Sequence, residues 1–341
     1  MQLLNTLYVL TQGSYLHKNG ENVVVSMQRT EMIRVPIHRL FGIACFGNIS
    51  ISPFLIQLCS DRGVSLSFLS ERGRFLGRFE GLASNAALLR REQYRKKDGS
   101  EFVVGLCKAI VAGKIANTRQ LVMRYARERK GEAASTLLSV GEQITRIARS
   151  LEEAKSADSV RGYEGEIAAL YFGAMDQMVL PDDQQMRFER RSRRPPKNPV
   201  NALLSFGYAI LLNDCISAIQ SVGLDPWVGY LHVEHPGRPS LALDLMEEFR
   251  AYLVDRMVIA MINRKQIGTE DFETDAVGGV SLTEKARKEF LAEYQNRKNT
   301  TLVHPLVAED VPVGLLPFVQ ARLLARVVRG DLDPYCPFPF R

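Results

Sequence analysis

Residues 229–250 have the sequence GYLHVEHPGRPSLALDLMEEFR, in which a loop rich in turn-forming residues leads into an apolar segment with helical spacing. Asp244, Glu247 and Glu248 are three and four residues apart in this segment, so we expect them to share one face of a helix. Apolar side chains crowd round these acids, which places some of the carboxylates near a packed core. A carboxylate near a core needs a cation or strong hydrogen bonds. His232, just upstream, indicates that the cation is a divalent metal ion.

The donor types in this segment limit the choice of metal. One histidine combined with carboxylates favours a hard cation that prefers oxygen, so we expect Mg²⁺ or Mn²⁺ rather than zinc, and the imidazole favours Mn²⁺ slightly. A lone histidine is more often structural than a ligand, so a structural role for His232 stays open. The chain has no Walker loop, GxSxG, HExxH or CxxC motif, which removes support for nucleotide-driven, serine-nucleophile and zinc-hydrolase mechanisms.

A second acidic candidate is Glu164, which lies between Gly162 and Gly165. Glycine inside a helix costs roughly 1 kcal/mol relative to alanine. One reason to accept that cost is that another group must approach the backbone closely, which would make Glu164 functional. The alternative is a loose helix start with surface acids.

Basic side chains are concentrated in residues 187–197, RFERRSRRPPK. The two prolines should hold this strip extended, and Asn198 with Pro199 should begin a helix directly after it. The N-terminus of a helix favours anions, so the strip predicts contacts with a phosphate backbone. The residues that we expect to bind DNA are Arg190, Arg193, Arg194 and Lys197. A solvated surface loop is the alternative.

The pattern of apolar residues predicts an α+β protein. Residues 1–85 have the two-residue alternation of half-buried strands, with one short helix that Ser52 and Gly63 should delimit. Residues 86–100 are basic and poor in apolar side chains, which predicts an interdomain linker. Residues 101–341 have helical spacing almost throughout and contain the candidate metal site.

Composition sets broader limits. The 341 residues are 46% hydrophobic and 24% charged, with a net charge of +6 and a pI of about 9.1, which permits a polyanionic partner without requiring one. The five cysteines are scattered, which argues against a disulfide framework. No leader peptide is visible, and the longest apolar run, residues 202–212, is shorter than the ~20 residues that a membrane helix needs. We therefore expect a soluble cytoplasmic protein.

Four stretches in this order resemble a known family: residues 163–165 (YEG), 194–211 (RPPKNPVNALLSFGYAIL), 229–232 (GYLH) and 236–250. They are similar to the CRISPR-associated adaptation endonuclease, the integrase that inserts new spacers in antiviral defence, in the version found in subtype I-C systems. The resemblance covers nearly the whole chain. It implies a β-rich N-terminal dimerisation domain and a helical catalytic domain.

The resemblance also implies a site and a reaction. It assigns the metal ligands to Glu164, His232 and Glu247, and it matches Asp244 to a further acidic position close to the metal. Some relatives have aspartate where this chain has Glu247, and either carboxylate can bind the ion. The implied reaction is phosphoryl transfer, in which the 3′-hydroxyl of incoming DNA, or water in hydrolysis, attacks a DNA phosphodiester.

The partners follow from the resemblance alone. They are double-stranded DNA, both spacer precursor and CRISPR repeat, a second copy of the chain, and a small ferredoxin-like companion whose dimer joins two dimers into a heterohexamer. Two other functions stay open: a non-catalytic DNA-binding scaffold with structural acids, and a metal phosphohydrolase that acts on small phosphate esters.

Overall fold

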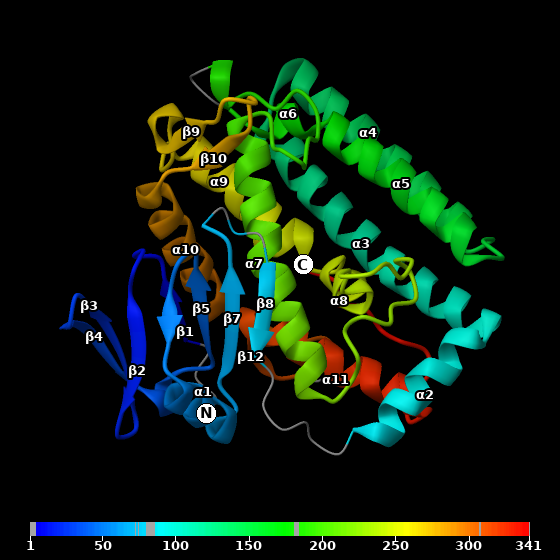
Figure 1. Cartoon of the computed structure of the whole chain (residues 1–341). Coiled ribbons are helices and arrows are strands. Elements are labelled where there is room, and N and C mark those ends of the chain that lie inside the picture. Colours follow the sequence, from blue (N-terminus) through cyan, green and yellow to red (C-terminus); the bar gives the residue numbers. More distant parts are fainter. Residues whose placement is uncertain are drawn as a thin grey trace. The chain divides into compact units, whose positions relative to one another are not determined.

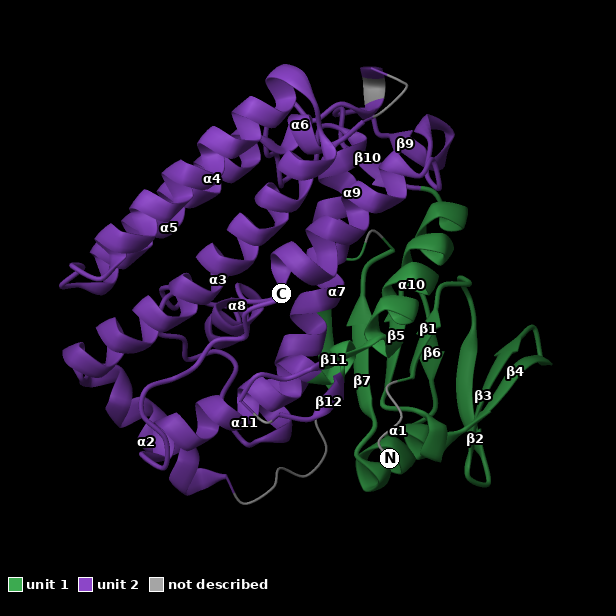
Figure 2. Cartoon of the chain, turned by 180° about the vertical axis from the view of Figure 1, so that it is seen from behind, with its two compact units in different colours: residues 1–84, 283–302, 312–315 green, residues 85–282, 303–311, 316–341 purple. Residues whose placement is uncertain are grey.

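The computed structural model describes residues 5–71, 73, 75–79, 86–180, 184–306 and 308–340 (Figure 1). The chain divides into two compact units (Figure 2). Unit 1 comprises residues 1–84, 283–302 and 312–315, and unit 2 comprises residues 85–282, 303–311 and 316–341. The N-terminal region is rich in strands and the rest is mainly helical, which confirms the predicted α+β class. The predicted boundary at residue 85 lies outside the described residues.

The described part of unit 1 contains two four-stranded sheets, ordered β1-β5-β7-β8 and β4-β3-β2-β6. β5 pairs in parallel with both β1 and β7, whereas β3 pairs antiparallel with β2 and β4. The strands are β1 (Thr6–Val9), β2 (Tyr15–Asn19), β3 (Asn22–Met27), β4 (Thr30–Pro36), β5 (Gly42–Phe46), β6 (Ser50–Ile51), β7 (Ser65–Leu69) and β8 (Phe75–Phe79). Buried side chains of these strands, including Leu16, Ile43 and Leu66, form one apolar core with Leu55 of the helix described next.

Two helices complete unit 1. In α1 (Pro53–Arg62) the Ser52 side chain accepts a hydrogen bond from Leu55 N, and Gly63 ends the helix with a φ of 65°, so both predicted helix boundaries are confirmed. The second is α10 (Glu284–Asn299), which groups with unit 1 although the sequence predicted it as part of the helical domain. Local periodicity identifies a helix but carries no information on which core it packs against.

Unit 2 is built mainly from helices. These are α2 (Ala87–Asp98), α3 (Ser100–Glu128), α4 (Gly131–Leu151), α5 (Ala157–Gly173), α6 (Met175–Met178), α7 (Pro199–Ser221), α8 (Ser240–Met246), a π-helical turn (Arg250–Asp255), α9 (Arg256–Asn263) and α11 (Leu316–Arg329). Helix α3 packs against both α4 and α5. After α9, β9 (Phe272–Thr274) pairs antiparallel with β10 (Val280–Leu282) in a hairpin. Elsewhere in the described chain, β11 (Thr301–Val303) and β12 (Asp310–Pro312) pair with each other. The 3₁₀ turns Ile37–Arg39 and Val313–Leu315 belong to unit 1, and Gln184–Met186 and Thr269–Asp271 belong to unit 2.

Helix α7 is the central helix of unit 2. Its N-cap is Asn198, whose side chain accepts a hydrogen bond of 2.8 Å from Asn201 N, and Pro199 occupies the first turn. Among the described helices, α7 is the one long and apolar enough to cross a membrane, which the sequence reading had not anticipated. However, 78% of its most apolar window is buried inside the protein, as expected for a core helix.

Residues 87–98 form helix α2, where the sequence predicted a linker. The helix is held by the buried Gln93, whose side chain donates to Asp225 O (2.8 Å) and Val228 O (2.9 Å) and accepts from Asp225 N (2.8 Å). These hydrogen bonds join residues that are more than 130 positions apart in the sequence. The local sequence of α2, which is basic and poor in apolar residues, therefore could not indicate them. They connect α2 to the loop that precedes the candidate site.

Candidate active site

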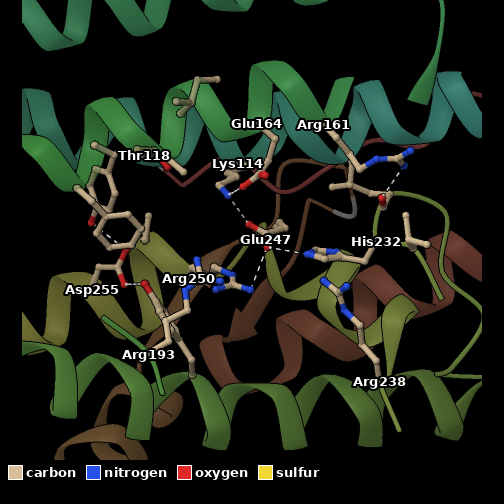
Figure 3. Close-up of a pocket in the computed structure, with 18 residues that line it drawn as sticks. Lys114, Thr118, Arg161, Glu164, Arg193, His232, Arg238, Glu247, Arg250 and Asp255 are labelled. Carbon is tan, nitrogen blue, oxygen red and sulfur yellow. Dashed lines mark hydrogen bonds and ion pairs between the residues drawn. The ribbon is translucent and has the colours of Figure 1, made fainter. Parts of the chain in front are cut away.

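Unit 2 contains a cavity of about 280 Å³ between α3, α5, α7 and the segment that runs from residue 231 to residue 255 (Figure 3). Glu164 enters it from α5, His232 from the loop before α8, and Glu247 from the turn after α8. The three ligands that the family resemblance implied therefore line one cavity, although they are far apart in sequence.

The His232 loop is held by Asp244, which is completely buried. Asp244 Oδ2 accepts from the backbone N–H groups of Tyr230 (2.6 Å) and Leu231 (3.1 Å). Its Oδ1 contacts both the backbone N–H and the Nδ1 of His232, each at 2.8 Å. Because a carboxylate accepts hydrogen bonds, Nδ1 carries a proton, and Nε2 is the nitrogen that offers a lone pair to a metal ion when the ring is neutral. Asp244 therefore positions the histidine, and Nε2 is the atom that faces Glu247, 3.7 Å from its Oε1.

Gly229 allows this loop to lie against the start of α8. A Cβ at this position would be 2.6 Å from the backbone carbonyl carbon of Ser240, which is too close for any other residue. Arg161 on α5 donates to Leu231 O at 3.0 Å and so attaches the loop to the helix that carries Glu164. The glycines beside Glu164 make no such close contact with the described residues. Contrary to the expected close approach, no described atom lies within 4 Å of a Cβ built at Gly162 or Gly165.

Glu164 and Glu247 meet at Lys114, which projects from α3. The Lys114 ammonium pairs with Glu164 Oε1 and lies 2.8 Å from Glu247 Oε2, and Arg250 pairs with Glu247 Oε1 at 3.0 Å. Burial alone would raise the pKa of Glu247, but Arg250, Lys114 and His232 outweigh it and lower the pKa to about 2. Glu247 is therefore ionised at neutral pH.

The donor set fits a divalent metal ion, although in the described part of the chain no three acidic, histidine or cysteine side chains stand close enough to hold one. Two carboxylates and an imidazole nitrogen are the ligands that Mg²⁺ and Mn²⁺ accept. Glu247 Oε2 is buried and poorly aligned for a hydrogen bond with Lys114, so it keeps an unsatisfied lone pair. The position between the two glutamates is taken by the lysine ammonium.

The basic residues of the predicted DNA-binding strip, residues 187–197, lie in different surroundings in the structure. Arg193 lines the cavity, whereas Arg190 and Arg194 are exposed outside it. Lys197 donates to Val277 O at 2.9 Å. Arg191, in the middle of the strip, instead turns inward, donates to Asn201 Oδ1 at 2.7 Å and lies over the Tyr208 ring.

Sequence reasoning missed four basic residues of the cavity: Lys114, Arg161, Arg238 and Arg250. A signal for Lys114 was present. Ile110, Thr118 and Leu121 are buried on one face of α3, and Lys114 occupies the same face at helical spacing. A lone lysine on an otherwise buried helical face needs a buried counter-charge. Arg238 lies in the loop between His232 and α8, beside the cavity (Figure 3).

The expectation that three acids share one helical face is wrong for Glu248. Helix α8 ends at Met246, and in the turn that follows Glu248 points away from Glu247. Its carboxylate accepts from Phe338 N and Gln320 Nε2, both at 2.8 Å, and from the Tyr335 hydroxyl. Burial raises the pKa of Glu248 to about 7, against the opposing effect of these hydrogen bonds. Glu248 thus holds the irregular C-terminal segment that follows α11 in the interior of unit 2.

A buried acid with two tyrosines closes the other end of the cavity. Asp255 accepts hydrogen bonds from the hydroxyls of Tyr208 (2.6 Å) and Tyr171 (2.8 Å). Burial raises the pKa of Asp255 to about 6, although the two tyrosines, Arg250 and Arg191 act in the opposite direction.

Comparison with known proteins identifies the family. The model of the family "CRISPR associated protein Cas1" matches residues 7–296. The chain is 47% identical over 339 residues to the CRISPR-associated endonuclease Cas1 1 of Chlorobaculum tepidum, with 99% of both chains covered. It is 45% identical over 342 residues to the CRISPR-associated endonuclease Cas1 2 of Rhodospirillum rubrum, with 99% of this chain and 98% of that protein covered.

A solved structure shows the same fold. A Cas1 protein from Thermotoga maritima superposes with a TM-score of 0.80 at 24% identity, over 96% of this chain and 97% of that chain. A casposase bound to its integration product gives 0.84 at 23% identity, over 98% of this chain and 93% of that chain. The chain belongs to the Cas1 family of CRISPR-associated proteins.

Proposed function

We propose that this protein is a metal-dependent DNA endonuclease and integrase that inserts new spacer DNA into a CRISPR array of subtype I-C. The observation that carries the proposal is that Glu164, His232 and Glu247 line one cavity together with several arginines. The relatives that share 47% and 45% of their residues with this chain are named endonucleases, which supports a nuclease activity.

The metal ligands in this proposal are Glu164, Glu247 and His232 Nε2. When bound, Mg²⁺ or Mn²⁺ would polarise the scissile phosphate and offset the negative charge that develops on it. Asp244 keeps His232 in the tautomer and orientation that ligation requires, through the hydrogen bond to Nδ1. Arg250 keeps Glu247 ionised, so the ligand needs no deprotonation before it binds a cation.

The arginines hold the DNA. Arg193 and Arg238 line the cavity beside the two glutamates and would bind the phosphate next to the reacting bond. Arg190, Arg194 and Lys197 would contact the backbone outside the cavity. In integration the incoming 3′-hydroxyl attacks phosphorus, a new P–O bond forms, and the bond to the leaving 3′-oxygen breaks. In hydrolysis water takes the place of the hydroxyl.

The proposed assembly follows the family. Unit 1, with its two sheets, would supply the contact of a homodimer. Two such dimers would flank a dimer of a small ferredoxin-like companion on double-stranded spacer DNA and the CRISPR repeat. We place this complex in the cytoplasm, and the burial of α7 is what a core helix, rather than a membrane span, would show.

A strand-transfer assay tests the reaction. The purified protein, with and without its companion, is mixed with short duplexes carrying free 3′-hydroxyls and a supercoiled target, in Mn²⁺, Mg²⁺ or EDTA. Glu164→Ala and His232→Ala are compared with Glu166→Ala, an exposed acid on the same helix as Glu164. Joined or nicked products that require metal and are lost in the first two variants but not in the third are the expected result.

One observation favours a second function, a DNA-binding scaffold without catalysis. Lys114 forms ion pairs with both glutamates without any metal, as it would in a purely structural ion-pair network. A scaffold would bind duplex DNA equally well in Mn²⁺ and EDTA, with affinity that falls steeply with salt, and would form no product with any variant.

A further inference from the structure

Lys114 has an unusual position for a lysine. Its side chain is only 13% exposed, and its ammonium joins Glu164 of α5 to Glu247 of the turn after α8, whose side chain is 3% exposed. Three separate chain segments therefore meet at one nitrogen atom (Figure 3). Burial of an ammonium is costly unless it is paired, and here it is paired twice.

The charges at this point balance without a metal ion. Lys114 and Arg250 supply two positive charges, and Glu164 and Glu247 supply two negative charges. Without Lys114, the two carboxylates would repel each other in a partly buried site. With Lys114 in place, a divalent cation between the same carboxylates would lie beside an ammonium group, and the two cations would repel each other.

We propose that Lys114 is an internal competitor of the metal ion: its ammonium occupies the position between Glu164 and Glu247 in the metal-free protein, and metal binding displaces it. The inference rests on the metal site of the proposed function and adds a residue that acts against metal loading. Lys114 neutralises the two glutamates of the empty site together with Arg250, which stabilises the protein before it meets metal and DNA. The protein should therefore bind a metal ion more weakly than the same ligands would without Lys114, because binding must also displace the lysine.

The inference predicts an effect opposite to that of losing a ligand. Lys114→Met removes the charge while keeping an unbranched side chain of similar length, so the metal no longer has a competitor. Close charge pairs at protein sites couple strongly enough that we expect Mn²⁺ to bind about tenfold more tightly. In EDTA the same variant should melt at a lower temperature than the wild type, because its two glutamates are left without the ammonium.

The experiment measures Mn²⁺ binding to the full chain by isothermal titration calorimetry, and melting temperature in EDTA and in saturating Mn²⁺. The variants are Lys114→Met, Lys114→Arg, Glu164→Gln and the control Lys108→Met. Lys108 lies on the same helix but donates to Glu152 O at 2.7 Å and does not line the cavity. Lys114→Gln replaces Lys114→Met if the latter does not fold.

The inference is supported if Lys114→Met binds Mn²⁺ more tightly than the wild type and shows a larger Mn²⁺-induced rise in melting temperature. Lys108→Met should then give wild-type values, and Lys114→Arg should give values near those of the wild type. Unchanged or weaker binding by Lys114→Met overturns it, because the lysine is then not displaced. The proposed metal site fails separately: if Glu164→Gln binds Mn²⁺ as well as the wild type does, the site is not where we place it, and the inference falls with it.

Discussion

Asp244 Oδ1 lies 2.8 Å from both the backbone nitrogen and the Nδ1 of His232, so one buried carboxylate orients the loop and the imidazole at the same time. The loop and the ring cannot move independently. This coupling places Asp244 behind the proposed metal site as a positioning residue rather than a ligand.

Asp244→Asn should therefore damage both stability and metal binding. An amide oxygen can replace only part of the acceptor set, and its NH₂ group would face the N–H groups of Tyr230 or His232. We expect a loss of roughly 2–4 kcal/mol in the free energy of unfolding, as for buried charge-assisted hydrogen bonds. Mn²⁺ affinity should fall by about 10–100-fold, as for other partners of metal-bound histidines. Urea unfolding and calorimetry measure the two effects, and full Mn²⁺ affinity in the variant would show that Asp244 does not position His232.

Glu248→Ala should destabilise unit 2 strongly. The change leaves Gln320 Nε2, the Phe338 N–H and the Tyr335 hydroxyl facing an empty space in the interior. We expect a cost of about 3–5 kcal/mol. Tyr335→Phe removes two hydrogen bonds, the one donated to Glu248 Oε1 and the one accepted from Gln320 Nε2, but it leaves the carboxylate in place and should cost only about 2 kcal/mol. Exposed Glu153→Ala is the control, and equal stability of all three variants would mean that the C-terminal segment is not held by Glu248.

Asp255 should make stability depend on pH. Burial, the largest effect, raises its pKa from 3.8 to about 6, so the folded protein holds this proton more tightly than the unfolded chain does. The resulting stability is fully present below the unfolded value and is lost as the pH rises through the folded value. The loss amounts to about 3 kcal/mol for a shift of this size.

Asp255→Asn has no such titration. We expect the wild type to lose stability relative to the variant as the pH rises from about 4 to about 7. Urea unfolding of both proteins over this range measures the two free energies of unfolding. Because both proteins share every other titrating group, the difference isolates Asp255. A difference that stays constant over this range would contradict the raised pKa.

Substitutions of Arg193 and Arg191 in the basic strip should affect different properties, DNA binding for the first and stability for the second. Arg193→Ala should weaken DNA binding and reduce the slope of affinity against salt by about one, without changing stability. Arg191→Ala should instead lower stability, by about 2 kcal/mol, because Arg191 is hydrogen bonded to Asn201 and Ser205 at the start of α7. Fluorescence anisotropy at several salt concentrations and thermal melting separate the two effects. If Arg191→Ala loses DNA binding at unchanged stability, the division of the strip is incorrect.

Much of the secondary structure could be predicted because its signals are local. Asn198 caps α7 by bonding Asn201 N three residues away, and Gly63 ends α1 through its own backbone conformation. The prediction failed at α2, where the fixing contacts of Gln93 are to residues 225 and 228. It failed again at Glu248, because helical spacing was extended past the point where α8 ends and the chain turns into a π-helical segment.

The sequence by itself determined the α+β class, both boundaries of α1, the start of α7, the family, and the residue types of the site, since caps, periodicity and motifs are properties of a few consecutive residues. Only the tertiary structure decided which of these residues meet. Lys114 is 50 residues from Glu164, and Glu248 is 87 residues from Tyr335. Such pairs form because burial forces every charge in the interior to find a partner, and the packing of the helices, not the order of the residues, decides which partner is in reach.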